Sequence, residues 1–179
     1  KENPKYNGWI SYTYSKNERQ FDNINQGKWY FHKYDRRNNL TITLDYKLNS
    51  TWKVASNFIF QTGSRITWPT AIQHKNDFSL LNTIGENQQS INLGTFYSSR
   101  NNQTLPAYHR LDIGFTKNYK TSKRNRAAQL YVGVYNLYAR ANPYAANWSS
   151  LYTDKKITVK QTANALFTII PSIAYSLKW

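Results

Sequence analysis

The feature that most constrains the fold is an alternation of apolar and polar residues that recurs six times along the 179 residues. In residues 40–48, for example, Leu, Ile and Tyr alternate with Thr, Asp and Lys. Successive side chains of a strand point to opposite faces, so each such segment has one oily and one polar face. Most of the segments alternate over about ten residues, the length that a tilted strand needs to cross hydrocarbon. We therefore expect strands at about residues 8–17, 36–48, 51–63, 107–119, 127–138 and 165–179.

The connections between these segments alternate between short and long. Only Asn49 and Ser50 separate the second and third segments, and a short basic run separates the fourth and fifth. The other gaps, at about residues 18–35, 64–106 and 139–164, are long enough to be external loops. All long loops then leave one side of an antiparallel, up-and-down sheet, which is typical of outer-membrane barrels.

Six strands are too few for a closed membrane barrel, which needs at least about eight. An open sheet in lipid would leave backbone N–H and C=O groups unpaired, at several kcal/mol each. The sequence thus predicts an all-β transmembrane barrel to which residues 1–179 contribute the last six strands. We expect the remaining strands to come from the same longer precursor, or from a second copy of the chain.

Composition narrows the choice of partners. The chain has a net charge of +15, is 16% aromatic, and lacks both cysteine and methionine. No run of 18 apolar residues is present, so no membrane-spanning helix is expected. The positive charge favours an anionic partner such as acidic lipid or lipopolysaccharide. The dense basic run at residues 117–126 would suit nucleic acid, but a solvated turn between strands is the simpler interpretation, and no nucleic-acid partner is expected.

Aromatic residues gather at the short-turn ends of the strands, where we predict an interfacial belt of Trp9, Tyr46, Trp52 and Tyr119. The final segment, "PSIAYSLKW", places Tyr175, Leu177 and Trp179 on its apolar parity. An alternating strand with a terminal aromatic resembles the signal that the barrel-assembly machinery recognises. The alternative is that these three residues simply face lipid, and lipid contact is compatible with a role in the assembly signal.

Ligand contacts, if this chain supplies them, should come from the long loops. Aromatic faces combined with cationic donors suit sugars, aromatic siderophores, haem or anionic chelates. The candidate residues are Trp29, Tyr30, His32, Arg36, Arg37, Trp68 and His74. The alternative is that these aromatics form an outer girdle or pack the loops together.

Arg110 and Asp112 share the polar parity of one strand and lie two residues apart. We expect them to form a charged network in the barrel wall or against a plug domain, rather than to bind a ligand. The three histidines are far apart and show no metal-ligand spacing, and no nucleophile motif is present. Neither an enzyme, a metal site nor a cofactor is therefore expected.

Four blocks of the chain carry a family resemblance. They are "YDRRNNLTITLDYKLNSTWKVASNFIFQTGSRITWP", "LPAYHRLDIGFTKNY", "LYVGVYNLYARANPY" and the terminal "PSIAYSLKW". In this order they resemble the C-terminal strands of a TonB-dependent outer-membrane receptor. The resemblance implies a 22-stranded barrel with an N-terminal plug domain, of which this chain holds neither the plug nor the TonB box.

The same resemblance implies an active transporter in the outer membrane of a Gram-negative bacterium. Such a protein binds a scarce nutrient (a siderophore, haem, cobalamin, a glycan or a peptide) and imports it with energy delivered by TonB. Its partners would be the rest of the barrel, the plug, the TonB system, the barrel-assembly machinery, lipopolysaccharide and, as a further candidate, a surface lipoprotein. The alternatives are a passive porin, an adhesin barrel, or a soluble carbohydrate-binding β-sandwich.

Overall fold

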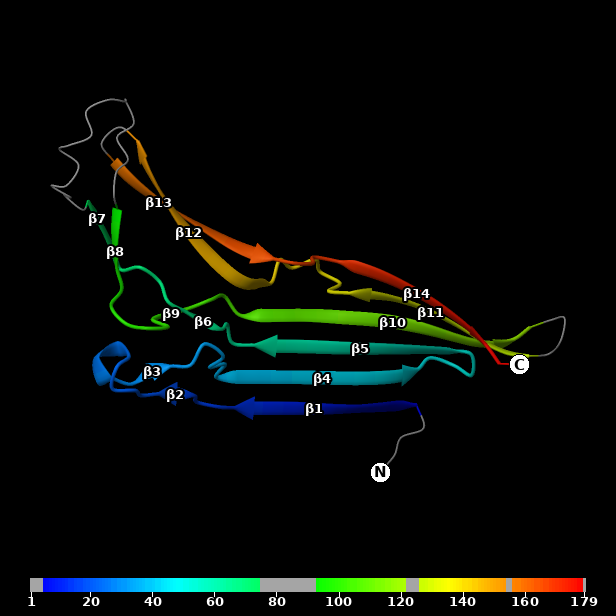
Figure 1. The fold of residues 1–179 in the computed structure, drawn as a ribbon. Helices are drawn as coiled ribbons and strands as arrows, with labels where there is room; N and C mark the ends of the chain where they lie inside the picture. Colours follow the sequence, from blue (N-terminus) through cyan, green and yellow to red (C-terminus); the bar gives the residue numbers. More distant parts are fainter. Residues whose placement is uncertain (1–4, 75–92, 122–125, 154–155, 179) are drawn as a thin grey trace.

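The computed structural model describes residues 5–74, 93–121, 126–153 and 156–178. Six antiparallel strands form the main sheet, and their order in space is their order along the chain (Figure 1). They are β1 (Tyr6–Tyr14), β4 (Asn38–Lys47), β5 (Trp52–Gln61), β10 (Tyr108–Lys120), β11 (Ala127–Tyr135) and β14 (Ile170–Leu177). The prediction of an all-β, antiparallel architecture is confirmed. The sheet is open, with β1 and β14 at its two edges.

The two ends of the sheet differ as the spacing of the segments predicts. The turn between β4 and β5 and the connection between β10 and β11 lie at one end, and the long connections leave the other end (Figure 1). Asn49 closes the first turn, because its Oδ1 accepts hydrogen bonds from the backbone N–H groups of Thr51 and Trp52, each at 2.8 Å. An Asn side chain that bonds to the backbone ahead of it is a common way to fix such a turn.

The long connections contain short strand pairs of their own. β2 (Glu18–Arg19) pairs with β3 (Tyr30–Phe31), β6 (Arg65–Ile66) with β9 (Gln103–Thr104), and β7 (Ala71–His74) with β8 (Leu93–Phe96). A short 3-10 turn, η1 (Asn25–Gly27), lies between β2 and β3. Within the described residues no helix is long and apolar enough to cross a membrane.

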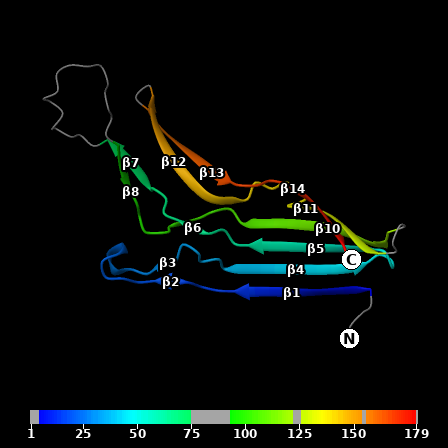
Figure 2. The same ribbon diagram turned by 45° about the vertical axis from the view of Figure 1, so that its right-hand side comes forward.

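The third long connection, expected as a loop at about residues 139–164, has a regular structure of its own. It is an antiparallel hairpin of β12 (Pro143–Thr153) and β13 (Lys156–Ala165), which extends beyond the sheet at its loop end (Figures 1 and 2). The strand expected at 165–179 is correspondingly shorter, since β13 ends at Ala165 and β14 begins at Ile170. The sequence gives little sign of this hairpin, because β12 is rich in small residues and alternates only weakly between apolar and polar ones.

The register gives the sheet one apolar and one polar face. Tyr46 pairs with Val54, Val54 with Phe115, Phe115 with Val132, and Val132 with Ile173. Directly opposed residues lie on the same face of an antiparallel sheet, so this row crosses five strands on one side. We call this side the apolar face and the opposite side the polar face; the polar face carries, among others, Thr43, Asn57, Thr116, Gln129 and Ser176.

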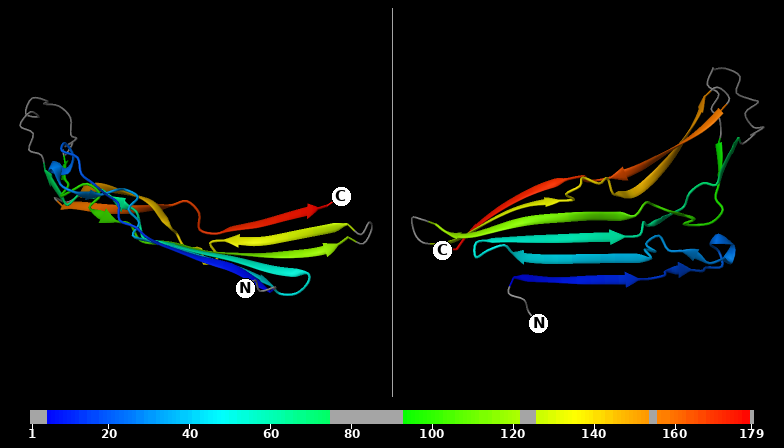
Figure 3. Two further views of the ribbon diagram at one scale, coloured as in Figure 1. Left: turned by 90° about the horizontal axis from the view of Figure 1, so that it is seen from below. Right: turned by 180° about the vertical axis from the view of Figure 1, so that it is seen from behind.

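No second layer of described residues covers either face of the sheet (Figure 3). Only Tyr30, Leu105 and Ala128 are buried among the apolar side chains of the described residues. On the apolar face, Val132 is 46% exposed and Ile173 75% exposed. The apolar rows therefore do not meet in an internal core, which is where a soluble β-sandwich would place them.

One close approach within the polar face depends on glycine. Gly114 of β10 pairs with Gly133 of β11, and the ring of Tyr131 lies over both. A Cβ atom added to Gly114 would stand 2.5 Å from the Tyr131 ring. The aromatic ring covers the gap that the two glycines leave and fixes the local pairing of the strands.

Candidate functional site

The loop end of the polar face carries a network of polar side chains that we call the Arg110 cluster: Tyr108, Arg110, Asp112 and Tyr135. Arg110 Nε lies 3.1 Å from Asp112 Oδ2, so the expected charge pairing of these two residues is present. The guanidinium also donates to the Tyr108 hydroxyl at 3.0 Å and to the Tyr135 hydroxyl, and stacks 4.1 Å from the Tyr135 ring. These contacts join β10 to β11 and hold the Arg110 side chain against the sheet.

The chain leaves regular pairing directly beyond this cluster, at Asn136. Asn136 is 1% exposed, with a positive φ of 54°, and its backbone N–H donates to Asp112 Oδ1 at 2.9 Å. Its side-chain amide donates to the backbone carbonyls of Arg140 and Thr168. Asn tolerates this left-handed conformation better than most residues, so it suits the point where β11 gives way to the β12–β13 hairpin.

A second group of charges, the Asp35 cluster, connects two of the long loops. The Asp35 carboxylate is 1% exposed and lies 3.1 Å from Arg37 Nε and 3.7 Å from Arg65 Nε. It also accepts the backbone N–H of Asn17 at 2.7 Å. Both guanidinium groups stack on the Phe31 ring, at 5.1 Å and 4.0 Å. One buried carboxylate thus holds together segments that are separated by up to 48 residues in sequence.

The charged form of Arg37 is well supported in this setting. Burial opposes it, but a hydrogen bond with Tyr14 and the attraction of Asp35 outweigh that cost and raise the pKa of Arg37 above its ordinary value. Arg37 was predicted as a ligand contact. The structure instead gives it a partner within the protein, so it is not a free cation for a ligand.

One cleft lies in the loops, and we call it the aromatic cleft. It has a volume of about 640 Å³ and is lined by residues 23–26, Lys28, Trp29, Thr67 and residues 97–100. Trp29 is 64% exposed, and Tyr97, Lys28 and Arg100 complete the aromatic and cationic lining. Asn25 joins its two sides, since Asn25 Oδ1 accepts the backbone N–H of Arg100 at 3.1 Å.

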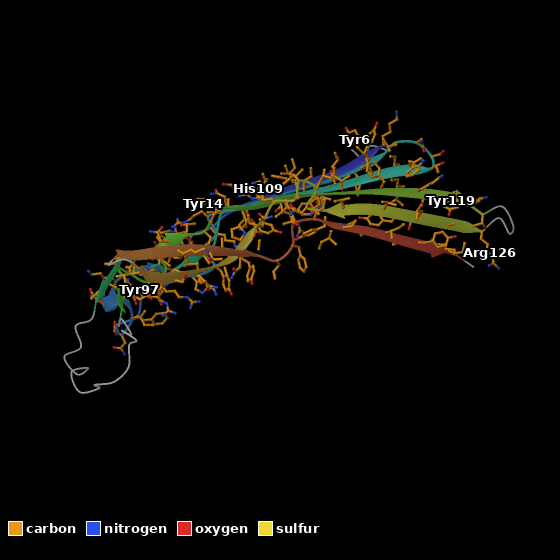
Figure 4. All side chains as sticks on the ribbon, turned by 90° about the horizontal axis from the view of Figure 1, so that it is seen from above. Tyr6, Tyr14, Tyr97, His109, Tyr119 and Arg126 are labelled. Carbon is orange, nitrogen blue, oxygen red and sulfur yellow. The ribbon has the colours of Figure 1, made fainter. Side chains whose placement is uncertain are left out.

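A second cleft of about 270 Å³ lies where the polar face meets the loops. Arg36 and Arg110 line it together with Tyr108, Gln61 and Tyr144 of β12. Figure 4 shows the arrangement of the two regions: His109, the neighbour of these residues on β10, lies where the sheet gives way to the loops, and Tyr97 lies further out. Arg36 and Trp29, predicted as one set, therefore line two separate clefts.

The other predicted ligand contacts are not gathered into one site either. Tyr30 is only 8% exposed, and the guanidinium of Arg100 lies 5.9 Å from the centre of the Tyr30 ring. Tyr30 therefore packs between the loops and offers little surface to a ligand. His32 contacts the ring of Tyr34 edge-on at 5.6 Å. Trp68 lines a third cavity of about 260 Å³, and His74 ends β7, with its side chain outside the described part. Tyr97 and Arg100, which line the aromatic cleft, were not among the residues expected from the sequence, because residues of irregular loops give no periodic signal.

Three of the four residues predicted for the aromatic belt share the apolar face of the sheet. Tyr46, Trp52 and Tyr119 have the same parity as the apolar rows and lie towards the turn end; Figure 4 shows Tyr119 at that end. The assignment of Trp9 to this belt is wrong, because Trp9 pairs with Thr43 and so lies on the polar face. Trp9 is adjacent to Ile10, which lies on the apolar face, so its parity turns it to the opposite side. Tyr175 and Leu177 lie on the apolar face, and Trp179 falls outside the described residues.

Comparison with known proteins assigns this chain to no family. Neither a family model, a curated protein nor a solved structure matches the chain. In the described residues, no group of three or more histidine or acidic side chains is placed to hold a metal ion. The functional argument therefore rests on the sheet, its two faces and the loop clusters.

Proposed function

We propose that this chain is the C-terminal part of the barrel wall of a TonB-dependent outer-membrane transporter. The observation that carries the proposal is the exposed, predominantly apolar face, which extends across all six strands. Contiguous apolar surface of this extent is rare on a protein that is surrounded by water. In a bilayer the same face contacts acyl chains, and the polar face lines an aqueous interior.

The free edges of the sheet support a larger barrel. The outer backbone groups of β1 and β14 have no strand partner within the described residues. In hydrocarbon each unpaired N–H or C=O costs several kcal/mol, so both edges need further strands. The proposal assigns those strands, the plug domain and the TonB box to the rest of the protein, in line with the resemblance of the four sequence blocks.

The difference between the two ends of the sheet supports an orientation. Short turns with Tyr46, Trp52 and Tyr119 fit the periplasmic interface, and the long loops with their clefts fit the cell surface. In this orientation the Arg110 cluster faces the lumen, where a plug would sit. Tyr175, Leu177 and Trp179 would be presented to the barrel-assembly machinery, and basic loop residues to lipopolysaccharide or to a surface lipoprotein.

The membrane part of the proposal is tested by single cysteines on adjacent residues of β4. These 179 residues hold no cysteine, so Leu44→Cys on the apolar face and Thr43→Cys on the polar face give a matched pair, made in a protein from which any cysteine outside this chain has been removed. In isolated membranes, Leu44→Cys should react with a lipid-partitioning maleimide and resist a charged one, and Thr43→Cys should do the reverse. Equal reaction of both variants with the charged reagent would refute the bilayer assignment, and so would recovery of the protein without detergent.

The transport part is tested by uptake in cells that lack the gene. We expect loss of growth on one nutrient from a panel of ferric siderophores, haem, cobalamin and oligosaccharides, with rescue by the gene. Rescue should disappear when a protonophore collapses the proton gradient or when TonB is removed. Uptake that persists under both treatments would identify a passive porin, and wild-type uptake of every nutrient would favour an adhesin.

A further inference from the structure

The apolar face contains one anomaly, Lys117 of β10. Lys117 lies directly opposite Trp52 of β5 on one side and Leu130 of β11 on the other. It is the single Lys, Arg, Asp or Glu on the apolar face among the described residues of the six strands. The other lysines within the six strands, Lys47, Lys53 and Lys120, lie on the polar face.

Two aromatic rings hold the ammonium group in place. Lys117 Nζ lies 5.4 Å from the centre of the Trp52 ring and 5.7 Å from that of Tyr119. Both distances are within the range of a cation–π interaction. The flexible stem of a lysine usually lets its charge move freely, so two flanking rings reduce the entropy that a bound anion would otherwise cost.

The charge of Lys117 has no anionic partner among the residues that the structure describes. No carboxylate of the described residues lies within ion-pair distance of Lys117. Directly next to it on the loop side, Phe115, Val54 and Val132 form an apolar row that is partly exposed. A molecule that fits both features has a negative group level with Lys117 and hydrocarbon that extends along the row.

We propose that Lys117, Trp52 and Tyr119 form a seat for the phosphate of a membrane phospholipid, whose acyl chains lie over Val54, Phe115 and Val132. The seat rests on the proposed function, because it requires this face to be in a bilayer, and it adds a defined lipid-binding site to it. The phosphate accepts hydrogen bonds from the lysine ammonium, and the hydroxyl and indole N–H of the two aromatic residues lie at headgroup depth.

The experiment measures the binding of a phosphatidylglycerol to the intact, delipidated protein in a non-ionic detergent by native mass spectrometry. A diacylglycerol with the same chains and inorganic phosphate serve as probes for the two halves of the lipid. We expect Lys117→Ala to weaken phosphatidylglycerol binding roughly tenfold, the loss of one charge-assisted hydrogen bond. Lys117→Arg should bind nearly as the wild type, and neither diacylglycerol nor inorganic phosphate should occupy the site.

Lys53→Ala is the matched control, since Lys53 opposes Thr116, the neighbour of Lys117, but lies on the polar face. It removes the same charge at the same level and should leave lipid binding unchanged. An equal loss in Lys53→Ala and Lys117→Ala would reduce the effect to overall charge and overturn the seat. Unchanged binding in Lys117→Ala, or equal binding of diacylglycerol, would overturn it as well.

The failure of the seat is distinguishable from that of the proposed function. Heat-dependent migration on gels checks that each variant is folded, and Lys117→Arg keeps the test valid if Lys117→Ala does not assemble. If the cysteine pair on β4 reports a lipid-facing surface and Lys117→Ala still retains the lipid, only the seat is wrong. If the cysteine pair reports water on both faces, the transporter assignment fails first.

Discussion

Replacement of Asp35 by Asn tests whether a single buried carboxylate organises the long loops. The change preserves the shape of the side chain and an oxygen that can accept the Asn17 N–H. It removes the charge that lies 3.1 Å from Arg37 and 3.7 Å from Arg65. Two guanidinium groups are then left close together without a counter-charge.

The expected cost follows from the burial of the three groups. Removal of one partner from a fully buried ion pair typically costs about 3–5 kcal/mol. The Asp35 side chain is fully buried, but the side chains of Arg37 and Arg65 keep 22% and 18% exposure, so water screens part of the remaining repulsion. We therefore expect local opening of the loops to become easier by about 2 kcal/mol.

Hydrogen exchange measures this opening directly. The N–H of Ser15 bonds to the Arg37 carbonyl and that of His32 to the Asn17 carbonyl, so both amides report on the segment that Asp35 anchors. Since a factor of ten corresponds to about 1.4 kcal/mol, their exchange should accelerate roughly 30-fold in Asp35→Asn. The β4 and β5 amides should keep their rates.

Asp22→Asn provides the control, because Asp22 lies exposed in the same loop. It makes the same chemical change without a buried partner and should alter exchange by less than about twofold, as surface substitutions usually do. Equal exchange in the two variants would refute the reasoning. So would an Asp35→Asn protein whose loop amides exchange at the wild-type rate.

Two further predictions concern the sheet. Gly114→Ala places a methyl group 2.5 Å from the Tyr131 ring and should lower the free energy of unfolding by about 1–3 kcal/mol, as measured by the urea midpoint of the folded protein. The double change with Tyr131→Ala should lose less than the two single changes together, and strict additivity would contradict the contact. Trp179→Asp, or removal of Trp179, should lower the amount of assembled barrel, so unchanged heat-modifiable protein in the membrane would refute its role in the assembly signal.

The sequence alone predicted the strands and, with few exceptions, their two faces. Alternation is a local property: residues 40–48 specify which side chains share a side before the strand meets any partner. The same reasoning paired Arg110 with Asp112, since residues two apart on a strand lie on one face. The short turn at Asn49 and the side from which the long loops leave followed from spacing alone.

Tertiary structure decided what depends on neighbours that are distant in the sequence. Pairing with β13 makes a hairpin of residues that were expected to form a loop. The partners of Asp35 and the two sides of the aromatic cleft come from loops that have no periodic pattern. Their positions arise from charge neutralisation and burial between segments, and a one-dimensional pattern does not encode which segments meet.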